Sequence, residues 1–436
     1  MTQVARCRVY KFGGASIRDA EAIRRLSALL APERERPRAL VVSAMGKTTN
    51  ALEALLAAAR RDDAADYRRW LESIRHDHLA VAEDLFGPDS PVADELEHKL
   101  AELDAAHAAH REAPYPFHYD QTVGMGELLS TTLLAAWLNQ RGVPTRWCDA
   151  RELIITDDRH QAAEIDWAAT RERIASLAAE CDELLLTQGF IGATKDGAMT
   201  TLGREGSDFS AAILAECLEA EALTVWKDVP GLFNADPRRF PNARQIRKIS
   251  YAEALEQTWH GAKVIHPRTL APLQRAGIPL TVRSFLEPEA PPSTIGPAPG
   301  DGDHRPALIL RDDQVLLEVS PREAGFIEAG LIAEALAALA EQGLNANLLE
   351  MEAQHLRLVV DHKGERLAPL LARLGACGAV THREGLALLT VRHPGEALMA
   401  ALDAGRRPLV ERSTPATAQR LYPAAECPER WTIPET

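Results

Sequence analysis

The segment LGREGSDFSAA, residues 202–212, holds the densest group of residues able to do chemistry in this sequence. Glycines flank Arg204, and Ser207 and Asp208 stand at the predicted start of a helix. Amides and a hydroxyl at a helix N-terminus bind anions, and an arginine binds carboxylate or phosphate through two parallel hydrogen bonds. Asp208 could instead be only the N-cap of the helix. So many glycines and polar residues between apolar runs favour a binding site over a purely structural turn.

A second candidate is VYKFGGASI, residues 9–17, which places Lys11 beside Gly13 and Gly14 at the end of a predicted strand. Glycine lets the backbone approach a ligand because it has no Cβ, and lysine supplies a point charge for a phosphate. Ser16 or Asp19 can cap the helix that follows. Taken alone, the segment fits a plain tight turn as well as a phosphate site.

A third polar patch follows the predicted strand in VVSAMGKTTN, residues 41–50. Its GKT resembles the end of a P-loop, but that motif needs a glycine where this chain has Val41, so we exclude a P-loop. The hydroxyls of Ser43, Thr48 and Thr49 still lie after a buried strand, where ligands of α/β folds bind. Helix capping explains the same residues equally simply.

Further charged residues follow other predicted elements. Glu127 falls in the first turn of a helix, where it either interacts with the helix dipole or binds a substrate ammonium. Lys227 and Asp228 follow a strand in VWKDVPGLFNADPRRF, with Arg238 further along, and Lys263 lies near a helix start in HGAKVIHP. Several positive groups at strand ends of an acidic protein indicate a concentrated anionic ligand, such as a nucleoside triphosphate.

The elements that must position these residues follow an α/β pattern. Short apolar runs such as RALVVSAM, CDELLLTQGFIGA and EALTVWKDV alternate with long helical stretches, which predicts a mostly parallel sheet covered by helices. Residues 51–112 are rich in Ala, Leu, Glu and Arg and predict two or three long helices inserted between strands.

The 436 residues suit two or three domains. The stretch EPEAPPSTIGPAPGDGDHRP, residues 287–306, is dense in proline and glycine and predicts an exposed connector. We therefore expect a first domain over residues 1–290, a linker over 291–306 and a second folded region over 307–436. In that last region a β, α, β, β order occurs twice, the second time in degraded form, and predicts two small α+β modules.

Composition excludes several classes of protein. With 46% hydrophobic and 26% charged residues the chain is a folded globular protein, and its net charge of −14 argues against nucleic-acid binding. There is no secretory signal and no run of about 18 apolar residues, so we expect a cytoplasmic protein without membrane segments. The six cysteines are widely spaced, without a CxxC pair, and predict reduced thiols and no metal site built from protein ligands.

Taken in order, KFGGASI, VVSAMGKTTN, GMGELLS, TTLGREGSDFSAA, WKDVPGLFNADPR and HGAKVIHP resemble the aspartate kinases of the amino-acid kinase family. The resemblance covers about residues 7–285, and the tail resembles the paired ACT modules that regulate such kinases. It implies an amino-acid-kinase-like sandwich, ATP and Mg²⁺ as co-substrates, L-aspartate as acceptor and 4-phospho-L-aspartate as product. This product is the first intermediate toward lysine, threonine and methionine.

The same resemblance implies roles for single residues. Lys11 would stabilise the transferring phosphoryl group and Asp208 would fix Lys11 and the substrate. The substrate-binding positions, where Glu127 lies near the amino group and Arg204 on the α-carboxylate, are Ser43, Thr49, Glu127 and Arg204. The nucleotide-binding positions are Lys11, Gly13, Gly14, Ser207, Lys227, Asp228, Phe233, Arg238 and Lys263.

Three positions depart from the family pattern, which often has Thr at Ala15, Thr at Lys227 and Tyr at Phe233. Because of these departures, the sequence does not define the detailed contacts to the nucleotide. The reaction class that the resemblance implies is unaffected. An aspartate side chain, with a pKa of about 3.9, is ionised at pH 7 and needs no general base. Catalysis then consists of positioning and charge stabilisation, with Mg²⁺ bound mainly through the nucleotide.

Alternatives remain for both parts of the chain. The acceptor could be glutamate, acetylglutamate or a nucleoside monophosphate, or the chain could be a non-catalytic amino-acid sensor. In the tail, Phe326, Gly330, Asn345 and Asn347 lie where ACT pairs bind an effector, for which we expect lysine, threonine or both; the alternative is a dimerisation unit without a ligand. By resemblance we also expect a homodimer or larger homo-oligomer.

Overall fold

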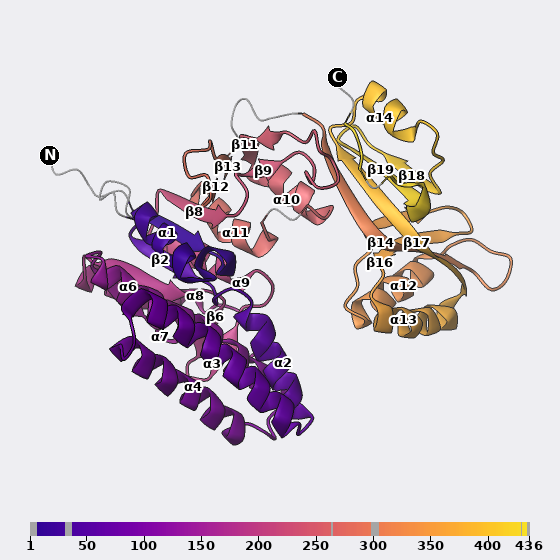
Figure 1. Ribbon diagram of the computed structural model, residues 1–436. Coiled ribbons are helices and arrows are strands. Elements are labelled where there is room, and N and C mark those ends of the chain that lie inside the picture. Colours follow the sequence, from indigo (N-terminus) through magenta and orange to yellow (C-terminus); the bar gives the residue numbers. More distant parts are fainter. Residues whose placement is uncertain (1–6, 31–36, 263–264, 298–304, 429, 434–436) are drawn as a thin grey trace. The chain divides into compact units, whose positions relative to one another are not determined.

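The computed structural model describes residues 7–30, 37–262, 265–297, 305–428 and 430–433 (Figure 1). The chain divides into two units. Unit 1 consists of Met1–Leu232, Ile246–Leu255 and Val264–Gly302, and unit 2 of Phe233–Gln245, Glu256–Lys263 and Asp303–Thr436. Two short segments in the middle of the chain, Phe233–Gln245 and Glu256–Lys263, thus belong to unit 2. The domains predicted from the sequence are contiguous and place both segments in the first domain.

Unit 1 is built on an eight-stranded sheet with the order β11-β13-β12-β8-β1-β2-β5-β3. The strands are β1 (Arg8–Phe12), β2 (Ala39–Val42), β3 (Thr145–Cys148), β5 (Leu184–Gln188), β8 (Ala222–Lys227), β11 (Lys248–Ser250), β12 (Leu280–Ser284) and β13 (Ser293–Gly296). All neighbouring pairs are parallel except β12 with β13. The predicted mostly parallel α/β sheet is confirmed.

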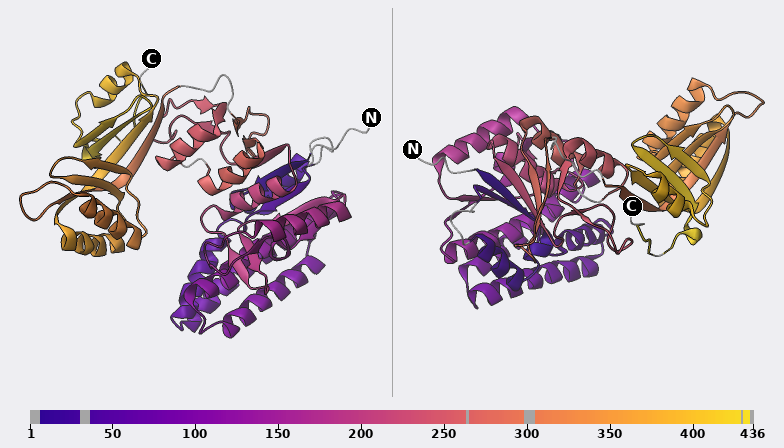
Figure 2. Two further views of the ribbon diagram at one scale, coloured as in Figure 1. Left: turned by 180° about the vertical axis from the view of Figure 1, so that it is seen from behind. Right: turned by 90° about the horizontal axis from the view of Figure 1, so that it is seen from above.

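Helices cover both faces of this sheet, as a parallel sheet requires (Figures 1 and 2). Alternation along β1 sends Tyr10 and Phe12 into one core and Val9 into the other. The first core receives α1 (Ala20–Leu30), α2 (Thr48–Arg60), α3 (Ala64–Phe86), α4 (Pro91–Ala109), α5 (Tyr115–Val123) and α6 (Met125–Gln140). The second receives α8 (Trp167–Glu180), α9 (Gly206–Cys217), α10 (Tyr251–Trp259) and α11 (Pro267–Ala276).

The predicted helical insertion over residues 51–112 forms three long helices, α2, α3 and α4. Ser90 caps α4 by accepting a hydrogen bond from the Ala93 amide, and Pro91 occupies the first turn. Leu96, Leu100 and Leu103 are fully buried along one face of that helix. Burying a leucine contributes about 2 kcal/mol and a cap about 1 kcal/mol, so packing stabilises α4 while the cap defines its start.

Smaller elements complete unit 1. A three-stranded sheet joins β4 (Ile155–Thr156), β6 (Ile191–Thr194) and β7 (Met199–Thr201), and the antiparallel β6–β7 pair forms a hairpin before α9. The 3-10 helix η1 (Gly14–Ile17) follows β1, and the short helix α7 (Ala150–Leu153) follows β3. Asp19 caps α1 through a 2.8 Å hydrogen bond from the Ala22 amide, as its position predicts.

Part of the predicted linker over residues 291–306 is not an exposed connector. Ser293–Gly296 forms β13, which pairs antiparallel with β12 and parallel with β11, and both Ser293 and Ile295 are fully buried. The two prolines before it indicate a break in structure, but they precede the strand, where no backbone N–H is needed. Residues 298–304 lie outside the described residues.

Unit 2 contains a six-stranded antiparallel sheet with the order β15-β16-β14-β17-β19-β18. Its strands are β14 (Ala307–Ser320), β15 (Leu348–Met351), β16 (Leu356–Asp361), β17 (Ala379–Arg392), β18 (Val410–Ser413) and β19 (Thr417–Pro423). Its helices are α12 (Ala329–Glu341), α13 (Gly364–Cys377) and α14 (Glu396–Asp403), with the 3-10 helix η3 (Ala424–Glu426). The two predicted α+β modules therefore share one sheet through the β14–β17 pairing. The short strands β9 (Leu232–Phe233) and β10 (Gln245–Ile246) pair separately.

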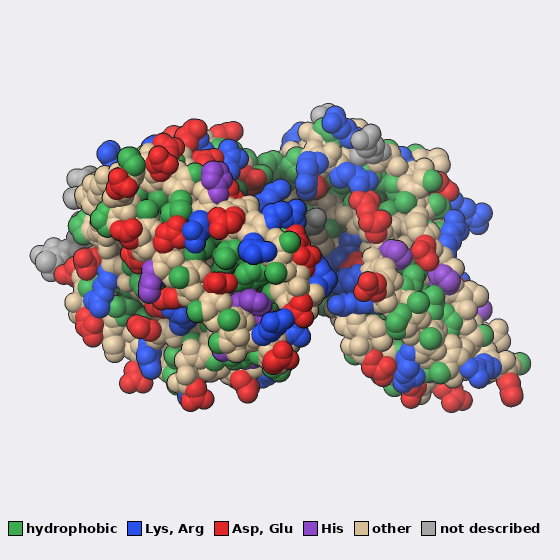
Figure 3. Space-filling view, turned by 60° about the horizontal axis from the view of Figure 1, so that its bottom comes forward, with side chains coloured by type: hydrophobic (Ala, Val, Ile, Leu, Met, Phe, Trp, Pro, Cys, Tyr) green, Lys and Arg blue, Asp and Glu red, His purple; other side chains and the backbone are tan. Residues whose placement is uncertain are grey.

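The surface charges, the cysteines and the helices can each be compared with the class of protein predicted from composition. On the face shown in Figure 3, acidic and basic side chains are interspersed. All six cysteines are free thiols, as predicted. Among the described helices, none is both long and apolar enough to cross a membrane.

Candidate active site

Unit 1 has a cavity of about 530 Å³, lined by residues from the loops after β2 and β5, from α2, α5 and α6, and from β7 and the start of α9. We call it the unit 1 cavity. Five residues predicted to bind substrate or nucleotide line it: Ser43, Thr49, Glu127, Arg204 and Ser207. The structure therefore gathers all four predicted substrate-binding residues, from three separate segments, around one space. Its remaining lining residues are Tyr115, Tyr119, Gln161, Phe190, Thr201, Gly203, Glu205 and Gly206.

Lys11 and Asp208 form an ion pair at the carboxyl end of β1. The Lys11 Nζ lies 2.6 Å from the Asp208 Oδ1, and the Lys227 Nζ at the end of β8 lies 3.9 Å from the Oδ2. Burial opposes ionisation of Asp208, but the charges of Lys11 and Lys227 outweigh it and lower its pKa below the usual value. Glu205, not Asp208, occupies the N-cap position of α9. Asp208 is thus an ionised anchor for two lysines rather than a helix cap.

The two glycines after β1 are close to the backbone and to the lysine. A Cβ on Gly14 would lie 2.6 Å from the Ala44 carbonyl oxygen, a distance that real Cβ atoms do not adopt. A Cβ on Gly13 would lie 3.5 Å from the Lys11 Nζ. Gly14 is therefore required by the close approach of the loop after β2, and Gly13 leaves the lysine head group uncovered.

Glu127 is almost completely buried at the start of α6, with 2% of its surface exposed. Burial raises its pKa to about 8, although backbone hydrogen bonds from Ala44 and Glu127 and the charge of Lys11 oppose the shift. Its Oε2 receives no hydrogen bond from any described residue. A buried carboxylate oxygen without a partner is costly unless a ligand supplies the donor, so Glu127 is suited to bind a cation.

The loop before α9 is held in an unusual backbone conformation. Glu205 has φ 51° and Gly203 φ 77°, and across the cavity Phe190 has φ 71°. A non-glycine residue in this left-handed region costs on the order of 1 kcal/mol, and such residues cluster at functional sites. The loop exposes Arg204, whose side chain has no ion-pair or hydrogen-bond partner among the described residues. The arginine fork is thus available for an anion.

Comparison with known proteins shows which family this chain belongs to. The model of the amino acid kinase family matches residues 6–284. The lysine-sensitive aspartokinase 3 of Escherichia coli (strain K12) is 36% identical over 392 residues, covering 88% of this chain and 86% of that protein. The chain belongs to the aspartokinases of the amino acid kinase family.

Solved aspartokinase structures agree with this assignment. E. coli aspartokinase III in complex with aspartate and ADP, in the R-state, matches with a TM-score of 0.81 and 32% identity over 96% of this chain and 97% of that chain. The same enzyme with lysine and aspartate, in the T-state, also matches with a TM-score of 0.81 and 32% identity, over 97% of both chains. As an aspartokinase, the chain is a kinase that transfers phosphate to aspartate, and the predicted fold and reaction class are confirmed.

A buried network that the sequence did not reveal supports the aspartokinase cavity. Asp120 of α5 is fully buried and accepts hydrogen bonds from the Thr201 Oγ1 at 2.6 Å and from the Gln161 amide. Its Oδ2 lies 2.8 Å from the His160 Nδ1. Burial raises the pKa of Asp120, and these hydrogen bonds offset part of that shift. Because Thr201 and Gln161 line the cavity, Asp120 positions two of its walls.

Two tyrosines of α5 are the other residues that sequence reasoning missed. Tyr115 and Tyr119 line the cavity, and the Tyr119 hydroxyl donates a 2.8 Å hydrogen bond to Glu53 of α2. The only available signal was the aromatic-rich YPFHY sequence, which contains no glycine or charge pattern typical of a ligand site.

The predicted nucleotide-binding residues are brought together only in part. Lys227 joins the Lys11–Asp208 pair, and Asp228 follows it directly at the end of β8. Phe233 and Arg238 belong to unit 2, where Arg238 pairs with Asp236 at 2.8 Å. Lys263 lies outside the described residues. The nucleotide roles of these last three residues stay predictions.

Proposed function

We propose that unit 1 transfers the γ-phosphoryl group of ATP to the side-chain carboxylate of L-aspartate and releases 4-phospho-L-aspartate and ADP. The observation that carries this proposal is that one cavity contains both a binding group for a cation and a binding group for an anion. Among the described residues, Glu127 offers a buried oxygen without a hydrogen-bond partner to the substrate ammonium, and Arg204 offers an unpaired guanidinium to the α-carboxylate. A ligand held at both ends presents its remaining carboxylate for transfer.

The transfer step requires charge stabilisation more than proton chemistry. The acceptor carboxylate is ionised at pH 7, so its oxygen attacks the γ-phosphorus as the bond to the β,γ-bridging oxygen breaks, and ADP leaves. Two anions must approach, and Lys11 offsets their repulsion. Asp208 holds the Lys11 Nζ at 2.6 Å, which orients the lysine before substrate arrives.

Magnesium fits this site as a partner of the nucleotide. In the part of the chain that the structure describes, no three His, Cys, Asp or Glu side chains gather as a metal site. The oxygens of Asp208 face two lysines, which makes them poor metal ligands. Mg²⁺ commonly binds through phosphate oxygens and waters, where it neutralises phosphate charge. We therefore expect it to enter with ATP.

Unit 2 is proposed to bind lysine as a feedback inhibitor. The E. coli relative is named lysine-sensitive and has been solved with lysine, which favours lysine over threonine as the effector. Of the predicted effector positions, Phe326 is 75% exposed, Gly330 lies at the start of α12, and Asn345 is exposed beside β15. Asn347 donates hydrogen bonds to Gln314 at 2.8 Å and to Asp361 at 2.9 Å.

A homodimer through unit 2 is the proposed assembly. Large apolar side chains are exposed on α12, on β15 and in the loop before α12; they are Phe326, Leu336, Leu349 and Met351. β15 is an edge strand, with backbone groups that a second copy can pair. An exposed apolar group beside an open edge is typical of an interface. We also propose a cytoplasmic location, which the free thiols support.

The reaction is tested by trapping the acyl phosphate with hydroxylamine. ATP-dependent hydroxamate is measured with aspartate, glutamate and N-acetylglutamate as acceptors, each with and without millimolar lysine or threonine. We expect a signal with aspartate alone and its suppression by lysine. Silence with every acceptor would favour a non-catalytic sensor, and a signal unchanged by lysine would remove the proposed effector.

A further inference from the structure

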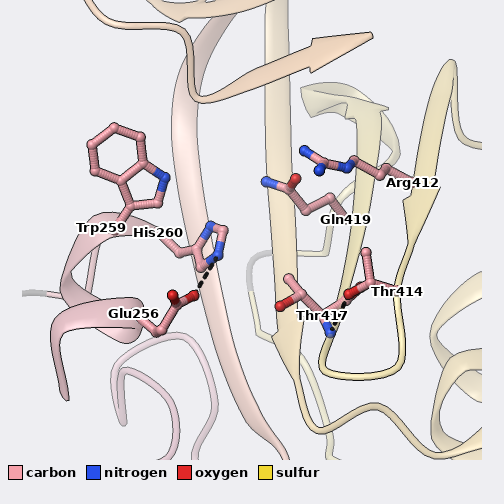
Figure 4. Close-up of a pocket in the computed structure, with 7 residues that line it drawn as sticks. All are labelled: Glu256, Trp259, His260, Arg412, Thr414, Thr417 and Gln419. Carbon is pink, nitrogen blue, oxygen red and sulfur yellow. Dashed lines mark hydrogen bonds and ion pairs between the residues drawn. The ribbon is translucent and has the colours of Figure 1, made fainter. Parts of the chain in front are cut away.

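Unit 2 contains a second cavity, of about 450 Å³, that the kinase reaction does not use. We call it the unit 2 cavity. One wall is the last turn of α10 with the residue after it, and the opposite wall is the β18–β19 hairpin (Figure 4). Both walls belong to unit 2. The volume of the cavity lies in the range of about 300–1,000 Å³ that is usual for small-molecule sites, and its lining combines one large aromatic side chain with several polar ones.

The first wall supplies an uncovered aromatic face. Trp259 is 63% exposed, and its indole has no partner among the described residues. A large aromatic surface left open in a soluble protein commonly stacks against a ligand. Beside it, the Glu256 Oε2 lies 3.3 Å from the Nη1 of the buried Arg392 and 3.9 Å from the His260 Nε2. Glu256, the one carboxylate among the described lining residues, is thus already paired with a positive charge.

The second wall supplies an unneutralised positive charge. The Arg412 guanidinium extends from β18 toward the cavity in Figure 4 and has no side-chain partner among the described residues. Thr414 and Thr417 lie on the same hairpin, where the Thr417 amide donates a 3.0 Å hydrogen bond to the Thr414 Oγ1 and the Thr414 hydroxyl donates its proton to the Thr417 carbonyl. The Thr417 Oγ1 accepts a hydrogen bond from Arg392, which leaves the Thr417 hydroxyl proton for a ligand. An arginine beside hydroxyl groups recognises carboxylate or phosphate.

Gln419 adds a neutral acceptor at the base of the hairpin. It is 3% exposed, and its Nε2 donates to the Asn347 carbonyl at 3.2 Å and to the Thr390 hydroxyl at 3.4 Å. Those bonds fix the amide with its Oε1 free of any described donor. The amide oxygen can therefore accept a hydrogen bond from an N–H or O–H of a ligand.

We propose that the unit 2 cavity binds a small molecule that joins an anionic group to a flat ring. The anion pairs with Arg412 and the Thr417 hydroxyl, and the ring stacks on Trp259. Aromatic amino acids and purine mononucleotides both have this chemistry. The proposal does not depend on the identity of the acceptor in unit 1.

The test is a binding measurement by calorimetry on the full chain with aspartate present at saturation; ADP is left out, because it joins phosphate to a purine and would itself compete for the proposed site. The probes are phenylalanine, tryptophan and AMP, and the matched controls lack one feature: alanine has no ring, and adenosine has no anion. We expect at least one of the three probes to bind and both controls to fail. Phenylalanine or tryptophan binding identifies an amino-acid site, and AMP binding identifies a nucleotide site.

Variants then locate the binding. Arg412→Gln and Trp259→Ala should each weaken it at least tenfold, whereas Arg383→Gln, at an exposed arginine of β17, should leave it unchanged. Circular dichroism and kinase turnover verify that each variant is folded. No binding of any probe at millimolar concentration, or binding that either variant leaves unaltered, would overturn the proposal.

Discussion

At the scale of single residues, the proposed chemistry depends most on the ion pair between Lys11 and Asp208. Lys11→Ala should lower kcat/KM for aspartate on the order of 100- to 1,000-fold, because it removes a preorganised charge at the transferring phosphoryl group. Lys227, 3.9 Å from Asp208, remains to compensate part of the buried carboxylate charge, so the variant should stay folded. Steady-state kinetics and thermal melts verify both points, with Lys248→Ala on the exposed part of β11 as control. Near-native turnover would exclude the assigned role.

Glu127 makes aspartate capture dependent on pH. Its pKa of about 8 in the free protein means that it is mostly protonated at pH 7, whereas the substrate ammonium binds the ionised form. Accordingly kcat/KM for aspartate should rise about tenfold per pH unit between pH 6 and 7.5 and level off above pH 8. Glu127→Gln should lower kcat/KM and flatten this profile. A flat profile in the wild type, or the same slope in the variant, contradicts ammonium binding by Glu127.

At the scale of elements, helix α5 connects the helical insertion to the active site through Asp120. An asparagine oxygen in place of the Oδ1 can still accept from the Thr201 hydroxyl, but the asparagine nitrogen replaces the Oδ2 acceptor that faces the Gln161 amide at 3.1 Å and the His160 Nδ1 at 2.8 Å. Asp120→Asn should therefore raise KM for aspartate about tenfold while KM for ATP and kcat change little. Asp104→Asn, which removes the charge of an exposed carboxylate that accepts a hydrogen bond from Tyr67, is the matched control. A tenfold fall in kcat with KM for aspartate unchanged would contradict this positioning role and would indicate a general loss of structure.

The elements also show what the sequence could predict. The buried parallel strand β2 is a continuous apolar run and β5 begins with three leucines, so their existence and the crossover pattern follow from the local sequence pattern. Polar residues after such strands were expected to meet, because the carboxyl ends of parallel strands share one edge. By contrast β13 is four residues long and follows two prolines, and Asp120 and Gln161 become neighbours only through tertiary packing. Local sequence carries no signal for these.

At the scale of the whole molecule, the proposed dimer makes unit 2 part of the regulatory mechanism. Leu349 and Met351 alternate onto the same face of β15, so the double change Leu349→Lys and Met351→Lys places two charges in the proposed interface. Light scattering should show a monomer that keeps basal kinase activity and has lost inhibition by lysine. Thr381→Lys on the interior strand β17 is the control and should remain dimeric. A dimeric double variant would exclude this edge as the interface.

The most direct test of the central claim is to identify which carboxylate of aspartate receives the phosphoryl group. Arg204 and Glu127 are assigned to the α-carboxylate and the ammonium, so only the side-chain carboxylate can reach Lys11. Trapping the wild-type product with hydroxylamine and identifying the hydroxamate by NMR should give the β-aspartyl isomer alone. The α-isomer, or a mixture of both, would contradict the orientation that the unit 1 cavity imposes.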